Sequence, residues 1–159
     1  NGIEVIGVGG ISASVTALSI SGLKNDSFTF YGFFPRENKD KKSLIETLKK
    51  SSVDTFIFYE SPKRILKTLE YLKDNFGDIK ICVCSDLTKL HEKSYFGTIE
   101  KVYNELVNNQ NVEKGEYTFV IEKCFTETPI LETSFLYGGY PFKDLKNGGV
   151  FNIFSATIS

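Results

Sequence analysis

Residues 55–77 read TFIFYESPKRILKTLEYLKDNFG and decide the fold class. The run 55–59 holds only aromatic and β-branched residues, which favours a strand. Ser61 and Pro62 then predict a helix start, with Ser61 as the cap and Pro62 in the first turn. Apolar residues recur at helical spacing as far as Gly77, which is typical of a helix end. A strand followed directly by an amphipathic helix indicates an α/β protein.

The same alternation continues on both sides of this unit. After an opening segment the order is β-α-β-α-β-β-α-β, which predicts an α/β fold with a mixed sheet and flanking helices. We divide the chain into an interdomain segment with a first helix (1–24), an α/β domain (25–123) and a tail of unknown role (124–159). The predicted helices cover about 12–22, 41–50, 61–77 and 98–106, and the strands cover 28–31, 55–59, 79–84, a short piece near 95, and 117–122.

Composition narrows the possible classes of protein. The chain has 159 residues and a net charge of -1, which argues against nucleic-acid binding by charge alone but leaves room for a local basic face. No run approaches the ~20 apolar residues of a membrane span. Cys82, Cys84 and Cys124 have no metal-ligand spacing, so we expect free thiols in a reducing, cytoplasmic compartment and no metal. A chain that starts at Asn1 and lacks Met is expected to be processed or a fragment.

Three polar clusters follow predicted strands, where open α/β sheets bind ligands. They are 9–13 (GGISA), 59–64 (YESPKR) and 86–92 (DLTKLHE). Each also has a purely structural interpretation: a turn with a helix cap, an ion pair at a helix start, or a solvated loop. Lys89 could hold phosphate, or act as a base if burial lowered its pKa. We expect 59–64 and 86–92 to line one groove.

Five motifs, in this order, resemble one family. They are ALSISGL (17–23), FTFYGFFP (28–35), FYESPKR (58–64), LTKLHE (87–92) followed by Gly97 and Thr98, and KGE (114–116). Together they are similar to the bacterial small-subunit ribosomal-RNA cytidine-2'-O-methyltransferases, a branch of the tetrapyrrole methylase superfamily. The resemblance implies the C-terminal domain of that fold, and the N-terminal domain of the family, with its cofactor loops, is expected to be absent from this chain.

The resemblance also implies the site. The cofactor would be S-adenosyl-L-methionine, bound weakly or not at all by this chain alone, and the substrate would be small-subunit ribosomal RNA. Candidate cofactor-binding residues are Ser12, Ala13, Tyr59, Gly115 and Glu116. Candidate substrate-binding residues are Glu60, Arg64 and His91. Lys89 or Glu92 is the candidate catalytic base.

Two other functions remain open at this stage. One is a methylase of the same superfamily that acts on a porphyrin-like small molecule. The other is a non-catalytic domain that dimerises or binds a partner through an uncovered apolar face. For the methyltransferase itself we expect a homodimer with no membrane contact.

Overall fold

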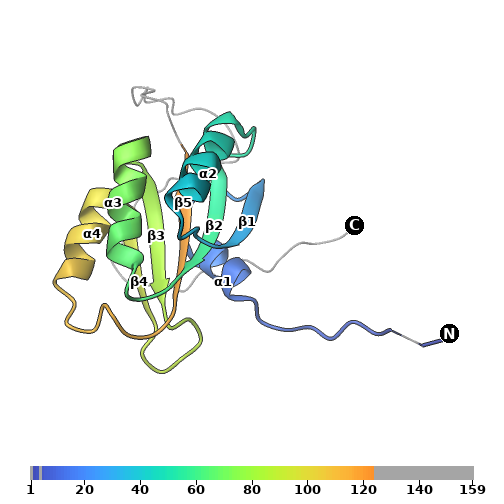
Figure 1. Cartoon of the computed structure of the whole chain (residues 1–159). Coiled ribbons are helices and arrows are strands. Elements are labelled where there is room, and N and C mark those ends of the chain that lie inside the picture. Colours follow the sequence, from blue (N-terminus) through green and yellow to red (C-terminus); the bar gives the residue numbers. More distant parts are fainter. Residues whose placement is uncertain (1, 4, 124–159) are drawn as a thin grey trace, which may run out of the picture. The chain divides into compact units, whose positions relative to one another are not determined.

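A computed structural model describes residues 2, 3 and 5–123. Its strands and helices follow the predicted order (Figure 1). They are α1 (Ala13–Ile20), β1 (Phe28–Phe33), α2 (Asn38–Lys50), β2 (Thr55–Glu60), α3 (Ile65–Phe76), β3 (Lys80–Ser85), β4 (Lys93–Thr98), α4 (Ile99–Val107) and β5 (Tyr117–Glu122). The fold class is therefore confirmed. Our division at residues 24 and 123 stays a prediction, and the tail from 124 lies outside the described residues.

The five strands form one mixed sheet in the order β1-β2-β5-β3-β4. Only β1 and β2 pair in parallel, whereas β5 pairs antiparallel with both of its neighbours, and β3 with β4. The last strand among the described residues, β5, thus lies at the centre of the sheet. Its position brings the polypeptide that follows β2 and the polypeptide that follows β3 to either side of the start of β5.

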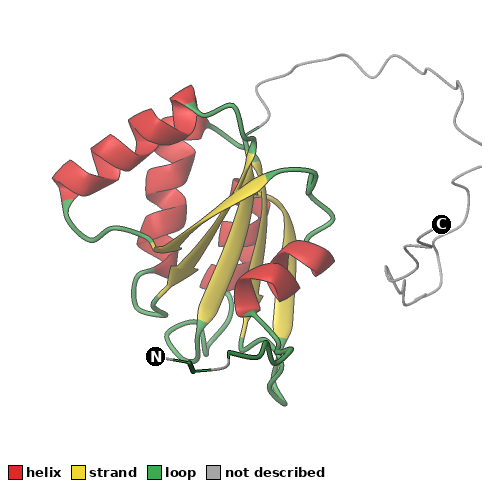
Figure 2. Ribbon diagram, turned by 90° about the vertical axis from the view of Figure 1, so that its right-hand side faces the viewer, coloured by secondary structure: helices red, strands yellow, loops and turns green. Residues whose placement is uncertain are grey.

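Helices cover both faces of the sheet (Figure 2). On one face α2, α3 and α4 pack over the larger core, which includes Phe58, Leu69 and Phe119. On the other face α1 packs over a smaller cluster that contains Ala17, Leu18, Ile57, Cys82, Cys84 and Val120. The alternation of side chains along β2, β3 and β5 divides their residues between these two clusters, as the pleat of a strand requires.

The start of α3 differs from the prediction. Ser61 is not the cap, because the first helical residue is Ile65 and Arg64 occupies the capping position. The carbonyl of Ser61 instead accepts hydrogen bonds from the backbone N–H groups of Arg64 and Ile65. With this turn, the guanidinium of Arg64 lies 2.8 Å from the carboxylate of Glu60, the last residue of β2. By contrast, Gly77 ends α3 and Thr98 caps α4, both as predicted.

Candidate functional site

The site region is the edge of the sheet where β2 and β3 end and β5 begins. Tyr117, the first residue of β5, pairs with Glu60 on one side and with Ser85 on the other. The predicted clusters at 59–64 and 86–92 therefore lie at the same edge, with the start of β5 between them. We expected these two clusters to line one groove, but they do not. Each borders its own hollow.

The first hollow, here called the aromatic hollow, has a volume of about 440 Å³. Its wall includes Tyr59, whose ring meets those of Phe30 and Phe33 edge to face, with centroids 4.8 and 5.6 Å away. Mostly apolar walls with a few polar groups are typical of small-molecule sites. The lining residues are Ala13, Phe33, Tyr59, Glu60, Ser61, Pro62, Gly115, Glu116, Tyr117 and Thr118.

The structure brings together most of the residues that we assigned to the cofactor. Ala13, Tyr59, Gly115 and Glu116 all line the aromatic hollow. Ser12 does not, because it is exposed and its hydroxyl shares a hydrogen bond with Ser14, at 2.8 Å.

Glu60 is occupied by contacts within the chain. Its side chain is only 1% exposed. The carboxylate accepts hydrogen bonds from the backbone N–H of Ser61 at 2.7 Å, from the guanidinium of Arg64 at 2.8 Å and from the hydroxyl of Thr68 at 2.6 Å. A buried carboxylate needs such partners, because burial of an unpaired charge is costly. Glu60 therefore stabilises the end of β2 and the turn into α3.

Arg64 extends the same network to the segment after β1. Its guanidinium also donates to the carbonyls of Phe34 and Pro35, at 2.7 and 3.2 Å. The assignment of Glu60 and Arg64 to the substrate stays a prediction, and Glu60 lines the aromatic hollow. In this structure both side chains join β2, α3 and the segment at 34–35, and neither presents a free charge to a ligand.

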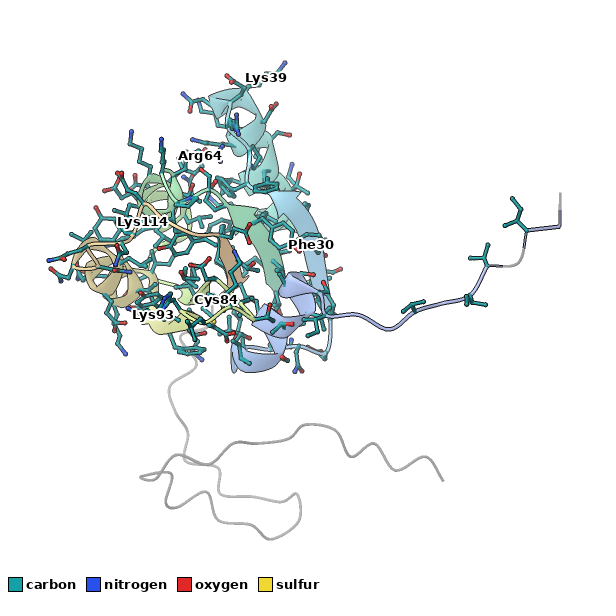
Figure 3. The ribbon with its side chains drawn as sticks, turned by 90° about the horizontal axis from the view of Figure 1, so that it is seen from below. Phe30, Lys39, Arg64, Cys84, Lys93 and Lys114 are labelled. Atoms are coloured by element: carbon teal, nitrogen blue, oxygen red, sulfur yellow. The ribbon has the colours of Figure 1, made fainter. Side chains whose placement is uncertain are left out.

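The second hollow, here called the basic hollow, lies beyond the start of β5 and has a volume of about 330 Å³. Of our substrate-binding candidates only His91 lines it. Figure 3 shows its residues Lys93 and Lys114 on one side of the view and Phe30 on the opposite side. Its full lining is Ser85, Asp86, His91, Lys93, Asn109, Asn111 and Lys114.

Gly115 and Asp86 lie against each other where the linings of the two hollows adjoin. Gly115 has a φ of +84°, and a Cβ there would overlap the carboxylate of Asp86. The backbone N–H of Asp86 also donates to the carbonyl of Glu116, at 2.9 Å. Gly115 borders the aromatic hollow and Asp86 borders the basic one. The position requires glycine for two reasons, conformation and space.

Lys89 lies between carboxylates on the surface. Its ammonium group is 3.0 Å from Glu116 and 3.2 Å from Asp86. The hydrogen bond to Glu116, followed by that to Asp86, raises the pKa of Lys89. The condition that we set for a lysine base, a pKa lowered by burial, is therefore not met here. Lys89 is protonated at neutral pH and acts as a charge.

Glu92, the other candidate base, faces its own loop. Its carboxylate accepts a hydrogen bond from the backbone N–H of Thr88, at 2.6 Å. Thr88 has a φ of +66°, so this bond fixes a left-handed turn in the loop. Neither Lys89 nor Glu92 lines either hollow. Their assignment as the catalytic base stays a prediction.

Sequence reasoning missed several lining residues. They come from two separate segments that the sheet brings together: Lys93 begins β4, and Asn109, Asn111 and Lys114 lie in the loop between α4 and β5. Tyr117 was read only as the start of a strand. Its hydroxyl is buried and makes no hydrogen bond with the described residues. Burial, followed by the charge of Tyr95, raises the pKa of Tyr117, and the nearby hydroxyl of Ser85 opposes that shift.

Cys82 and Cys84 line neither hollow, and Cys124 lies outside the described residues. Cys82 and Cys84 are free and buried beneath α1, with their sulfur atoms 3.5 Å apart, as the sequence predicts for alternate residues of a strand. The residues described by the structure contain no group of side chains that could hold a metal ion. Within the same residues, no helix combines the length and the apolar character needed to cross a membrane.

Comparison with known proteins places this geometry in a family. Ribosomal RNA small subunit methyltransferase I of Halalkalibacterium halodurans is 38% identical over 121 residues, which are 76% of this chain and 41% of that protein. The protein of the same name from Bacillus subtilis is 40% identical over 118 residues, 74% of this chain and 39% of that protein. The protein of that name from Thermotoga maritima is 34% identical over 120 residues, which are 76% of this chain and 52% of that protein. The chain thus spans about two fifths to one half of these relatives.

A family model described as Tetrapyrrole (Corrin/Porphyrin) Methylases matches residues 1–103. The match includes α1, the strands β1 to β4 and the start of α4, and with them Tyr59 of the aromatic hollow, but it ends before β5. The chain therefore belongs to the tetrapyrrole methylase family.

Proposed function

We propose that this chain is part of an S-adenosyl-L-methionine-dependent methyltransferase that modifies the ribose 2'-hydroxyl of a cytidine in small-subunit ribosomal RNA. The names of the relatives support the RNA substrate, and the aromatic hollow supports the cofactor. When bound, the cofactor supplies an electrophilic methyl group on its sulfonium. The residues of this chain would bind and orient the adenosine part.

The observation that carries the proposal is the aromatic hollow. Four residues that the resemblance assigns to the cofactor, drawn from α1, β2 and the turn before β5, line one cavity of suitable size. Such convergence is not expected of four unrelated surface residues. In-line placement of a ribose hydroxyl against the methyl group can by itself supply ~7–11 kcal/mol of the barrier reduction in well-oriented cases.

We also propose that another polypeptide segment or a second protomer completes the cofactor site. The rim of the aromatic hollow is apolar and uncovered among the described residues: Phe33 is 71% exposed, and Val15, on the neighbouring helix α1, is 53% exposed. Exposed apolar residues that gather in one place indicate an interaction surface. The same observation favours the second candidate function, a partner-binding or dimerising domain, and is compatible with a cytoplasmic homodimer.

Calorimetry of the 159-residue chain with S-adenosylhomocysteine tests the cofactor site. We expect weak, millimolar binding that Tyr59→Ala abolishes, because Tyr59 forms the aromatic wall. Phe96→Ala is the matched control, since Phe96 is an exposed ring on β4 at the far side of the sheet. Equal binding by Tyr59→Ala and Phe96→Ala would contradict the assignment. Micromolar binding by the unmodified chain would contradict the need for a completing segment.

Mass spectrometry of ribosomal RNA tests the substrate. Deletion of the gene is expected to remove one 2'-O-methylcytidine from small-subunit RNA. Unchanged methylation of that RNA, together with a change in a tetrapyrrole product, would favour the small-molecule alternative. Unchanged methylation and unchanged tetrapyrroles would favour the non-catalytic domain.

A further inference from the structure

We infer that the basic hollow binds the phosphodiester backbone of the RNA next to the nucleotide that is methylated. This inference rests on the proposed function. It moves substrate binding away from Glu60 and Arg64 and assigns it chiefly to Lys93 and Lys114, with His91 beside them.

The charges in the hollow favour an anion. Its only carboxylate belongs to Asp86, which is already paired with Lys89 at 3.2 Å. Lys93 and Lys114 form no ion pair with any residue that the structure describes, and both are exposed. The hollow therefore holds two uncompensated positive charges in a chain whose net charge is -1. A ligand that carries phosphate would neutralise them.

The neutral groups suit a sugar-phosphate ligand. Asn109 is held in place: its amide donates to the hydroxyl of Tyr95 and its carbonyl oxygen accepts from the backbone N–H of Asn111, both at 3.0 Å. These bonds fix the loop after α4 that forms one wall of the hollow. Asn111 is exposed and borders the hollow, where its amide can meet ribose or base edges, whereas the buried Ser85 donates its hydroxyl to the carboxylate of Asp86 at 3.5 Å.

The position of the hollow fits a role in substrate binding. Two of its lining residues adjoin Gly115 of the aromatic hollow, Lys114 along the chain and Asp86 in space. A methyl group and a ribose hydroxyl must approach within bonding distance, so the two ligand sites of a methyltransferase must be neighbours. Solvated surface lysines are the simpler interpretation of Lys93 and Lys114. It does not account for their convergence on one cavity from the start of β4 and from the turn before β5.

Fluorescence anisotropy with a short single-stranded RNA tests the inference on the full chain. The double variant Lys93→Gln/Lys114→Gln is expected to bind about tenfold more weakly, because two phosphate contacts are lost. Between about 50 and 200 mM salt, the slope of log affinity against log salt should become shallower by ~1.4, at ~0.7 for each contact to a single strand.

The control is Lys80→Gln/Lys101→Gln, which removes the same charge at the opposite edge of the sheet, where β3 begins and β4 ends. We expect its affinity to change less than about twofold, with an unchanged salt slope. Equal losses in the two double variants would overturn the inference, because only overall charge would then matter. Absence of RNA binding by the unmodified chain at the lowest salt would overturn it as well.

Cofactor calorimetry on the same variants separates this inference from the proposed function. Lys93→Gln/Lys114→Gln should bind S-adenosylhomocysteine as the unmodified chain does, because neither lysine lines the aromatic hollow. If this double variant keeps both its cofactor binding and its RNA affinity, the basic hollow is not an RNA site, but the proposed function still stands. Unaltered cofactor binding by Tyr59→Ala would overturn the proposed function whatever the RNA result.

Discussion

The segments after β2 and β3 are similar in composition and opposite in surroundings. Each begins at a strand end and mixes carboxylates with cations, Glu60 and Arg64 in one, Asp86 and Lys89 in the other. Glu60 is 1% exposed and holds Arg64 in a buried network, whereas the side chain of Lys89 is 52% exposed. Two segments with similar charged residues can therefore have different roles. A buried pair such as Glu60 and Arg64 stabilises the fold, whereas an exposed residue such as Lys89 is open to solvent.

Arg64→Ala should have the largest effect, because it leaves the buried Glu60 carboxylate without its cation. Removing one partner of a buried pair costs ~3–5 kcal/mol, and the partial exposure of Arg64 places the expected loss near the lower end. Chemical denaturation measures it. The exposed neighbour Lys63, changed to alanine, should alter the free energy of unfolding by less than ~0.5 kcal/mol. Equal losses for the two variants would contradict a structural role for Arg64.

Gly115→Ala should have the next largest effect, since it disturbs the close contact between Gly115 and Asp86. The left-handed backbone costs a non-glycine residue ~1–2 kcal/mol, and the new Cβ would also displace Asp86. Gly22→Ala is the control, because Gly22 has a φ of +64° but no heavy atom near its Cβ position. We expect Gly115→Ala to lose more stability than Gly22→Ala and to weaken both cofactor and RNA binding. Equal losses of stability in Gly115→Ala and Gly22→Ala would argue against the close contact between Gly115 and Asp86.

Tyr117→Phe should have a smaller effect of opposite sign. Its hydroxyl is buried without a hydrogen bond, so removal is expected to stabilise the chain by ~1 kcal/mol. Because burial raises the pKa of Tyr117, the unfolded chain loses this proton first as the pH rises above ~10, and stability falls. Tyr117→Phe should reduce that alkaline loss. A destabilised variant would mean that Ser85 or another group bonds the hydroxyl.

The smallest expected effect is the shift in the pKa of Lys89, which distinguishes a surface charge from a catalytic base. Its contacts with Glu116 and Asp86 raise its pKa above the ordinary 10.5. Side-chain NMR of Lys89 should therefore show a titration above 10.5. A titration below 10.5 would contradict the surface role and restore Lys89 as a candidate base.

The helices and strands were predicted well, because they depend on residues close together in the sequence. Hydrophobic periodicity marks α2, α3 and α4, Thr98 caps the helix that follows it, and Gly77 ends the helix before it. Short motifs with a fixed order also pointed to four residues that line the aromatic hollow, Ala13, Tyr59, Gly115 and Glu116. The role of Glu60 and Arg64 was not predicted, because it depends on carbonyls 29 and 30 residues earlier in the chain. Lys93 and Lys114 were missed for the same reason: only the central position of β5 brings their segments together.

We propose that one edge of the sheet holds two neighbouring ligand sites of different chemistry. The most direct test is a pair of NMR titrations of the same isotope-labelled chain, one with S-adenosylhomocysteine and one with a short single-stranded RNA. The account predicts two distinct sets of shifted resonances, centred on Tyr59 and Ala13 for the first ligand and on Lys93 and Lys114 for the second, and meeting only at Gly115. Both ligands shifting one common set, or the RNA shifting the surroundings of Arg64 instead, would contradict it.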